Sequence, residues 1–460
     1  MMKNSKKLLA LVLVALSCLS LVACTATPAT SPEASKAPAA EETAAPAEAK
    51  GDVKLSIVML GYNDTQIEAA QSKDGGPVGS DKYYMTNREK AEAAYPDVTF
   101  EWNDWGWAET LDQKQRAAIA AGNPSSCIAG ESFIPTYANS GILQEVPADV
   151  LEGIDPSFVA YGADGKAYAV AYKTSIFMLF YNKDLLSKAG LDPEKAPATW
   201  SEWQQMSDQI TAAGAGEYWG GGIPSFPHNG GALRATPFFR QLGTDFGGND
   251  QINLNDPKVQ QTLEFIREMD KNFPAGLGNN TDEGPMWNAF EQKDQQNLAF
   301  VINGTWEEAN SLRNDVNLGV APLPLPDEGG QIGNCLVGTV YIGVPVGVSE
   351  EETRAFWDFY KNIALSEEQL QYWVDESCVV PLTSMINNSA LYEGDGKAGL
   401  RVAVEALRNG TYSGQAAFAK NDSQVWEIIN QQVLARVTMT QDPIDQICSQ
   451  AQAQIEALLK

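Results

Sequence analysis

Apolar and polar positions in the first third of the chain predict alternating strands and helices. Residues 54–60 (KLSIVML), 98–102 and a short piece at 127–129 form apolar runs of strand length. Residues 87–96 and 109–124 show instead the spacing of amphipathic helices, and glycine and proline end the second of them. Strands that alternate with helices in this way predict an α/β lobe built on a largely parallel sheet.

The same alternation continues further along the chain. Residues 176–181 form a near-continuous apolar run, which is typical of a strand covered on both faces. Three segments have the Ser/Thr-x-x-Glu/Gln spacing of capping boxes that open helices, at 199–202, 349–352 and 366–369. The stretch LAFVINGTWEEANSL predicts a strand, a glycine turn and the start of a helix.

The N-terminal segment combines a positive start, an apolar core and a cysteine. Three lysines precede the apolar residues 8–21, which are too few to span a bilayer, and LVAC ends at Cys24. This pattern resembles the lipobox of bacterial lipoproteins, which implies a signal peptide at 1–23 and a lipid on Cys24. An ordinary secretory signal cleaved elsewhere is the alternative. Residues 24–51 are poor in aromatic residues and predict a flexible tether that holds an extracytoplasmic domain at the cell membrane.

Composition and charge narrow the classes of function. The 460 residues carry a formal net charge of −27, which would repel nucleic-acid phosphates and excludes nucleic acid as a partner. About 400 residues after the tether are enough for two lobes. The single histidine, His228, excludes a histidine-rich centre, and neither a metal nor a cofactor is expected. Cys127, Cys335, Cys378 and Cys448 are widely scattered, which favours buried free thiols over disulfides.

Several segments together resemble one known family. DGKAYAVAY precedes LFYNKDLLSKAGLDPEKAPATWSEW, and AFVINGTW, GVAPLPLP and VVPLTSMI follow in the same order. These segments are similar to the extracellular solute-binding lipoproteins of bacterial ABC importers, in the maltose-binding-like group (family 1). The resemblance implies an α/β, two-lobed, periplasmic-binding-protein-like fold of type II with a hinge and an interlobe ligand cleft. It implies a first lobe of residues 52–174 and 341–392, and a second lobe of residues 175–340 and 393–460.

The family implies a monomeric binding protein with no catalytic residues. Such a protein would capture a sugar or oligosaccharide between its lobes and deliver it to an ABC permease. Glycerol phosphate, a polyamine or iron are alternative solutes, and a phosphate would need Lys173, Arg234 and Arg240 to converge on the cleft. Because aromatic residues outnumber these cations, a sugar is favoured. An anchored glycoside hydrolase, with two carboxylates flanking the cleft, and a scaffold protein without a small ligand are further alternatives.

Most candidate ligand-binding residues follow predicted strand ends, where open α/β sheets bind ligands, or lie at the proposed hinge crossings. Trp426 is a candidate because the resemblance places an aromatic ring in this region in some relatives. They are Tyr62, Asn63, Trp105, Trp107, Gly130, Glu131, Ser132, Tyr172, Ser175, Trp306, Tyr341 and Trp426. Glu131 is the first-choice carboxylate, with a merely solvated side chain as the alternative.

The tryptophans divide into candidate platforms and candidate core residues. Trp306 follows an apolar strand and Gly304, so it is the preferred platform for stacking on a sugar ring; packing of its helix onto the sheet is the alternative. The helical spacing of Trp426 fits a core position equally well. The amphipathic patterns around Trp203, Trp357 and Trp373 favour the core for these three residues.

Overall fold

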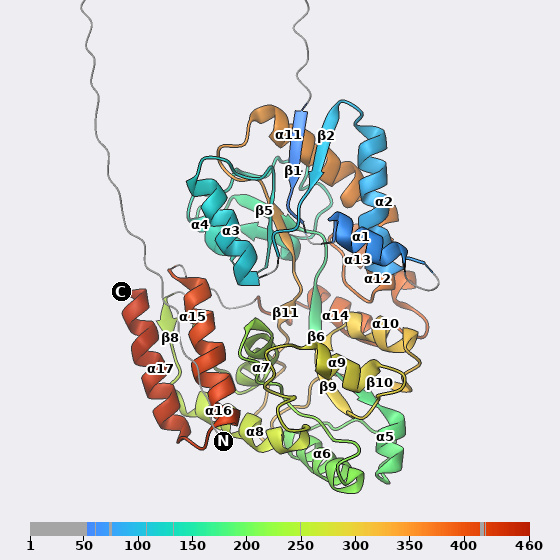
Figure 1. Ribbon diagram of the computed structural model, residues 1–460, viewed down its shortest axis with the longest axis vertical. Coiled ribbons are helices and arrows are strands. Elements are labelled where there is room, and N and C mark those ends of the chain that lie inside the picture. Colours follow the sequence, from blue (N-terminus) through green and yellow to red (C-terminus); the bar gives the residue numbers. More distant parts are fainter. Residues whose placement is uncertain are drawn as a thin grey trace, which may run out of the picture. The chain divides into compact units, whose positions relative to one another are not determined.

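The computed structural model describes residues 53–59, 61–72, 76–106, 108–131, 133–248, 250–414, 418 and 420–460 (Figure 1). The signal peptide predicted at 1–23, the tether predicted at 24–51 and the proposed lipid site Cys24 lie outside the described residues, as do Trp107 and Ser132. In the described part of the chain, no helix is both long enough and apolar enough to cross a bilayer.

The first lobe contains two groups of strands. β1 and β2 pair in parallel, whereas β3, β12, β5 and β4 form a sheet in which all neighbours are antiparallel. The elements of this lobe are β1 (Val53–Ile57), α1 (Asp64–Gln71), α2 (Gly79–Ala94), β2 (Val98–Trp102), α3 (Ala108–Ala120), β3 (Ile128–Gly130), α4 (Ile134–Asn139), β4 (Val159–Tyr161), β5 (Ala167–Ala171), β12 (Tyr341–Gly343), α11 (Glu350–Phe359), α12 (Glu367–Asp375) and α13 (Thr383–Ile386).

The prediction of a largely parallel sheet is wrong for this lobe. β12 comes from late in the chain, inserts between β3 and β5, and runs antiparallel to both of them. Local alternation of strands and helices cannot reveal a strand that arrives from a distant part of the sequence. The predicted positions of the early strands are nevertheless close to those observed, and the strand predicted at 98–102 has the bounds of β2.

The second lobe is organised around one buried strand, β6. All eight residues of β6 are buried, as its unbroken apolar run predicted. β9, β10 and β11 all pair with β6 in the antiparallel sense. The elements of this lobe are β6 (Ser175–Asn182), α5 (Lys183–Lys188), α6 (Trp200–Gly214), α7 (Asn229–Gln241), β7 (Gly247–Gly248), β8 (Gln251–Ile252), α8 (Pro257–Met269), α9 (Gly284–Glu291), β9 (Phe300–Gly304), α10 (Trp306–Arg313), β10 (Leu318–Ala321), β11 (Leu336–Val337), α14 (Ala398–Arg408), α15 (Asp422–Ile428), α16 (Arg436–Met439) and α17 (Ile444–Leu459).

Buried hydroxyl groups join the segments that connect the lobes. Thr174, between β5 and β6, shares a hydrogen bond of 2.6 Å with Thr339, between β11 and β12. The backbone of Thr174 also exchanges hydrogen bonds of 2.8 and 2.9 Å with that of Val379. Next to it, Ser175 Oγ lies 2.7 Å from Thr305 Oγ1. These contacts bring four segments of the chain together, at 174–175, 305, 339 and 379, and the exact lobe boundaries remain a prediction.

The three predicted capping boxes are formed to different extents. At the start of α11, Ser349 and Glu352 make the complete reciprocal box. At α6, the Thr199 side chain accepts a hydrogen bond from the Glu202 N–H. The Glu202 carboxylate accepts a hydrogen bond from the N–H of Ala198, the residue before Thr199. The box predicted at 366–369 is wrong: α12 does begin after Ser366, but the Gln369 side chain is buried and accepts a hydrogen bond from a threonine of α2.

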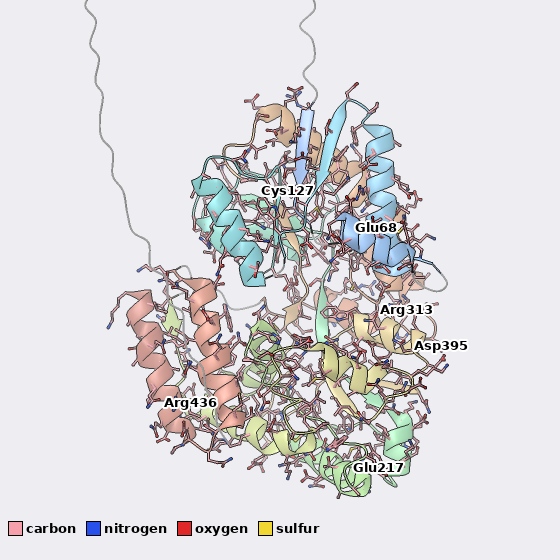
Figure 2. All side chains as sticks on the ribbon, in the orientation of Figure 1. Glu68, Cys127, Glu217, Arg313, Asp395 and Arg436 are labelled. Carbon is pink, nitrogen blue, oxygen red and sulfur yellow. The ribbon has the colours of Figure 1, made fainter. Side chains whose placement is uncertain are left out.

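The hydrophobic cores account for most of the large aromatic residues. Trp203, Trp357 and Trp373 are 0, 3 and 5% exposed, which confirms their predicted core positions. The cysteines also behave as predicted: Cys127, Cys335, Cys378 and Cys448 are buried and free. Cys127 is labelled in Figure 2, where it lies inside the first lobe. Its burial raises the pKa of the thiol to about 12, so it stays protonated and unreactive.

Candidate functional site

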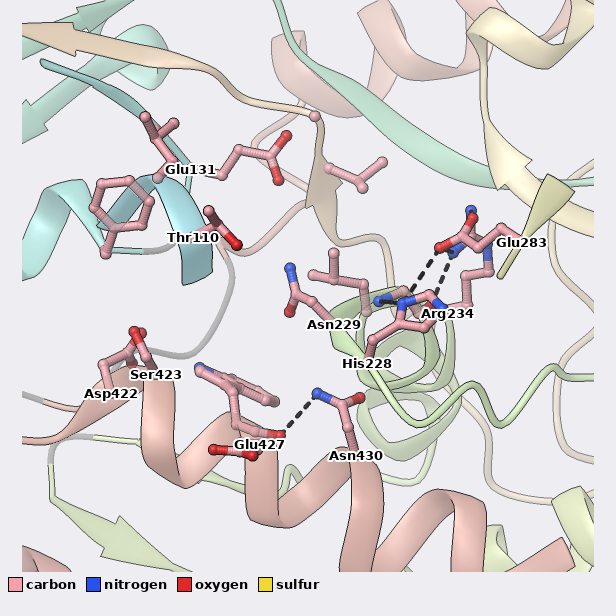
Figure 3. Close-up of a pocket in the computed structure, with 18 of the residues that line it drawn as sticks. Thr110, Glu131, His228, Asn229, Arg234, Glu283, Asp422, Ser423, Glu427 and Asn430 are labelled. Atoms are coloured by element: carbon pink, nitrogen blue, oxygen red, sulfur yellow. Dashed lines mark hydrogen bonds and ion pairs between the residues drawn. The ribbon is translucent and has the colours of Figure 1, made fainter. Parts of the chain in front are cut away.

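A cavity of about 520 Å³ is lined by residues of both lobes and of the segments that connect them (Figure 3). The first lobe contributes the start of α3 and the end of β3. The second lobe contributes the starts of α7 and α10 and one face of α15, and Lys173 and Gly338 come from the connections between the lobes. The volume is in the range of small-molecule sites, which are few per protein and often lie at domain interfaces.

Trp306 forms part of the cavity wall at the beginning of α10. Its indole lies against two glycines: a Cβ atom at Gly304 would be 2.2 Å from the ring, and one at Gly338 would be 2.8 Å from it. Side chains at these positions would displace the ring, so the glycines allow it to lie close to the backbone of the lobe connection. The ring is partly buried and remains in contact with the cavity.

Lys173 projects its ammonium group between two indoles. The Nζ atom lies 5.2 Å from the centroid of Trp306 and 5.0 Å from that of Trp373, which are cation–π distances. No hydrogen bond or ion pair joins Lys173 to another residue within the described part of the chain. Its three N–H donors are therefore available to a bound solute.

Glu131 provides a carboxylate at the end of β3. Burial raises the pKa of Glu131, and the positive charge of Lys173 opposes that shift. Like Lys173, Glu131 has no hydrogen-bond or ion-pair partner among the residues that the structure describes. The cavity thus offers an unpaired acceptor group and an unpaired donor group near a flat aromatic ring.

Arg234, on α7, is by contrast fully engaged. Its Nη atoms donate to both carboxylate oxygens of Glu283, at 3.2 and 2.9 Å. The remaining three N–H groups donate to the carbonyl oxygens of Gly230 and Ile302 and to Asn303 Oδ1, at 2.9 to 3.2 Å. All five donors of the guanidinium are therefore occupied by protein.

His228 caps the N-terminus of α7 and stacks on Phe226, with the ring centroids 5.1 Å apart. Its Nδ1 accepts the Gly230 N–H at 3.3 Å, which places the proton of the neutral ring on Nε2. Burial lowers the pKa of His228, although the Glu283 carboxylate acts in the opposite direction. The histidine is consequently a neutral residue of the cavity wall rather than a second cation.

α15 forms the remaining wall with Asp422, Ser423, Trp426 and Glu427. Trp426 is only 4% exposed, and its ring packs edge-on against aromatic residues of the second-lobe core. Burial raises the pKa of Asp422 to about 7, even though its Oδ1 accepts a hydrogen bond from a backbone N–H. This part of the cavity is therefore acidic, and only at higher pH does Asp422 carry a full charge.

Comparison with known proteins places this geometry in a family. The profile of the bacterial extracellular solute-binding protein family matches residues 75–369. The chain belongs to this family. This confirms the function expected from the sequence at the level of a solute-binding protein of an ABC importer.

Two of the relatives carry sn-glycerol 3-phosphate in their names. The sn-glycerol-3-phosphate-binding periplasmic protein UgpB of Brucella melitensis is 24% identical over 298 residues, which are 62% of this chain and 67% of that protein. UgpB of Salmonella typhimurium is 26% identical over 266 residues, 55% of this chain and 59% of the relative.

The solved structures support the fold. Maltose-bound MalE3 of T. maritima matches 88% of this chain and 99% of its own, with a TM-score of 0.69 and 18% identity. The GacH receptor of Streptomyces glaucescens matches 90% of this chain and 99% of its own, with a TM-score of 0.68 and 20% identity. These likenesses show that the solute-binding protein has the two-lobed, maltose-binding-like fold that the sequence predicted.

Four of the residues predicted as ligand contacts lie on the cavity wall of the solute-binding protein: Gly130, Glu131, Trp306 and Trp426. They come from β3 in the first lobe and from α10 and α15 in the second. The fold therefore brings together residues that are almost 300 positions apart in the sequence. Whether these residues contact a solute remains a prediction.

Three of the other predicted residues lie inside the first lobe or at its edge. Tyr62 is fully buried and stacks on Trp102, with ring centroids 5.1 Å apart. Asn63, 5% exposed, caps α1 by accepting the Gln66 N–H at 3.0 Å. Trp105 packs against the hydrophobic residues around α3 and α4. These positions give the three side chains structural roles, and none of them lines the cavity.

Residues predicted at the hinge crossings also lie away from the cavity wall. Tyr172 is 1% exposed and shares a hydrogen bond of 3.0 Å with Tyr84, and Ser175 bonds to Thr305 as described above. Tyr341 is part of β12 and packs against the first-lobe core. The crossings themselves do reach the cavity, but through Lys173 and Gly338.

His228, Asn229 and Glu283 also form part of the cavity wall, although they are not among the ligand contacts predicted from the sequence. His228 and Asn229 lie in the glycine-rich segment 220–231, whose glycines lack the spacing of a nucleotide-binding motif. In the structure His228 caps α7, so this segment is a loop that ends in a helix start at the cavity. In the described part of the chain, no three His, Cys, Asp or Glu side chains cluster as metal ligands.

Proposed function

We propose that this solute-binding protein captures a sugar or oligosaccharide in the cavity and delivers it to the permease of an ABC importer. The observation that supports the proposal is the combination of Trp306, Glu131 and Lys173. A sugar ring presents C–H groups that stack on an aromatic face, and each of its hydroxyls both donates and accepts hydrogen bonds. The cavity supplies one partner of each kind, and neither charged group has a protein partner that it must give up.

Glycerol phosphate is the second candidate, because the UgpB relatives carry that solute in their names. The charges of the cavity argue against it. Arg234 has no free donor, burial keeps His228 neutral, and Lys173 is the remaining cation among the described residues of the wall. Glu427 also lines the cavity and would repel a phosphate dianion, and Glu131 and Asp422 would add to this repulsion at a pH at which they are ionised.

The setting of the protein is part of the same proposal. A lipid on Cys24 would anchor a monomer to the outer face of the cell membrane through the tether at 24–51, and the signal peptide at 1–23 would be removed. No chemistry is proposed at the site. Capture of a solute does not need the paired carboxylates of a hydrolase. In this proposal the acidic residues of the cavity serve as hydrogen-bond acceptors for the solute.

A binding screen of the purified protein tests the proposal. Isothermal titration calorimetry and thermal unfolding would be measured with a panel of mono- and oligosaccharides, with sn-glycerol 3-phosphate and spermidine as separate arms. A specific solute at a hundredfold excess over its Kd stabilises the fold by about 2.7 kcal/mol. Binding of sn-glycerol 3-phosphate without any sugar would favour the second candidate. Cleavage of an oligosaccharide during the incubation would contradict a role in capture alone.

A further inference from the structure

A direct hydrogen bond joins the two lobes beside the cavity. Ser423 Oγ, at the start of α15 in the second lobe, donates to Asp112 Oδ2, on α3 in the first lobe, over 2.9 Å. This contact does not involve the chain segments that connect the lobes. It therefore depends on how the lobes are placed relative to each other, and it is lost if they separate.

Asp112 is held in position by its own lobe. The carboxylate is 3% exposed, Tyr137 Oη donates to Oδ1 at 2.6 Å, and Arg116 Nε donates to both oxygens at 2.9 and 3.1 Å. The Arg116 guanidinium in turn lies over the Tyr137 ring, 4.7 Å from its centroid. An acceptor that two donors of its own lobe already hold in place loses little freedom when Ser423 binds to it, which favours the interlobe hydrogen bond.

The neighbours of this pair form one side of the cavity. Thr110 and Leu111 directly precede Asp112, and both line the cavity, as do Asp422 and Ser423. Figure 3 shows Thr110 facing Asp422 and Ser423, with Arg234 and Glu283 on the other side of the cavity. The Ser423–Asp112 bond thus fixes two strips of cavity wall, one from each lobe, at a set distance.

We propose that Ser423 and Asp112 form a latch that holds the lobes closed around a solute. Both are positioning residues: Asp112 lies behind the cavity wall and acts on binding only by setting the fraction of closed protein. Because closure and binding are linked, a bond made only in the closed form raises the apparent affinity by as much as it raises the closed fraction. The effect on affinity rests on the proposed function, whereas the effect on closure does not.

The size of the effect follows from the type of bond. A hydrogen bond between a hydroxyl and a carboxylate changes an equilibrium by about ten- to a hundredfold, depending on how much water replaces it. Loss of the Ser423 hydroxyl should therefore shift the ratio of open to closed protein by about this factor. Ser423 is partly exposed on a helix, where alanine is readily accommodated, so the fold should tolerate the change.

Small-angle X-ray scattering of the protein without added solute gives the decisive measurement. Ser423→Ala should have a larger radius of gyration than the parent, whereas Ser423→Thr keeps the hydroxyl and should resemble the parent. Ser384→Ala is the matched control, since Ser384 Oγ also donates to a carboxylate at 2.9 Å, that of Glu367, but within the first lobe. Equal radii for Ser423→Ala and the parent, with equal melting temperatures, would overturn the latch.

A double-mutant cycle separates the latch from a direct contact between Ser423 and the solute. The tightest-binding glycan of the screen serves as the probe, and its dissociation rate is measured for Ser423→Ala, Asp112→Asn and the double variant. A latch predicts faster dissociation in each single variant and little further change in the double variant. Additive effects would contradict it. If no glycan binds, the proposed function fails, while the scattering result still decides the latch.

Discussion

Replacing Trp306 with alanine tests whether the sugar platform and the structure of the lobe connection depend on the same ring. The ring is partly buried between the two hydrophobic cores and lies under the Lys173 ammonium at 5.2 Å. A fully buried tryptophan contributes about 3–5 kcal/mol to stability, so a partly buried one should contribute about 2 kcal/mol. The lost cation–π contact adds about 0.5–1 kcal/mol.

The expected loss in binding is of similar size but is measured separately. An aromatic anchor in a binding site is worth about 2 kcal/mol or more, which corresponds to about a thirtyfold increase in Kd. Calorimetric titration with the tightest-binding glycan gives the Kd, and urea unfolding without glycan gives the stability. Trp306→Phe retains an aromatic face and should recover much of the affinity.

One outcome would refute this reasoning. If Trp306→Ala binds the glycan as tightly as the parent, the indole does not stack on a sugar, however much stability is lost. A loss of stability with unchanged affinity would leave the ring with a packing role alone, which is the alternative that the sequence left open. Saturation of both proteins at the same temperature must be established for this comparison.

Three further predictions concern charge and anchoring. Glu283→Ala should free two donors of Arg234 at the cavity wall, so we expect measurable binding of sn-glycerol 3-phosphate by calorimetry and a loss of about 1–3 kcal/mol in stability; no gain in phosphate binding would contradict the saturated guanidinium. Burial, with a contribution from Glu291, raises the pKa of Glu307 to about 8. The folded pKa of Glu307 exceeds the ordinary value of 4.5. Its contribution to stability is therefore greatest below about pH 4.5, and it is lost as the pH rises from there through 8. Glu307→Gln should therefore weaken the dependence of unfolding free energy on pH in this window, as measured by urea unfolding, and an unchanged slope would count against it. Cys24→Ser should move the protein from the membrane fraction into the medium or leave an unprocessed precursor in fractionation experiments; processed, membrane-bound mutant protein would rule out the lipid site.

Local patterns in the sequence predicted the elements well because their causes are local. An apolar run buried on both faces gave β6, and the serine–glutamate pair at 349–352 gave a complete helix cap, since backbone and side chain meet within one turn. The resemblance of several ordered segments also predicted the two-lobed fold. Four of the predicted contact residues reach the cavity. Gly130 and Glu131 lie at the end of β3 and Trp306 begins α10, whereas Trp426 lies within α15.

Contacts between residues distant in the sequence decided the strand pairing of the first lobe and the burial of some predicted contact residues. The insertion of β12 between β3 and β5 made the first-lobe sheet antiparallel, and nothing near either strand in the sequence shows this. Tyr62 follows a strand end as the rule for ligand sites requires, yet the stack on Trp102 turns it into the core.

The sequence by itself predicted kinds of group that line the cavity, namely an indole, a carboxylate and few cations. Only the tertiary structure decided which of them are free. Arg234 and Lys173 are both cations of the cavity wall, but Glu283 and three other residues accept all the donors of Arg234, whereas two aromatic faces leave the donors of Lys173 open. The availability of a charged group depends on its neighbours in space, and residues distant in the sequence supply those neighbours.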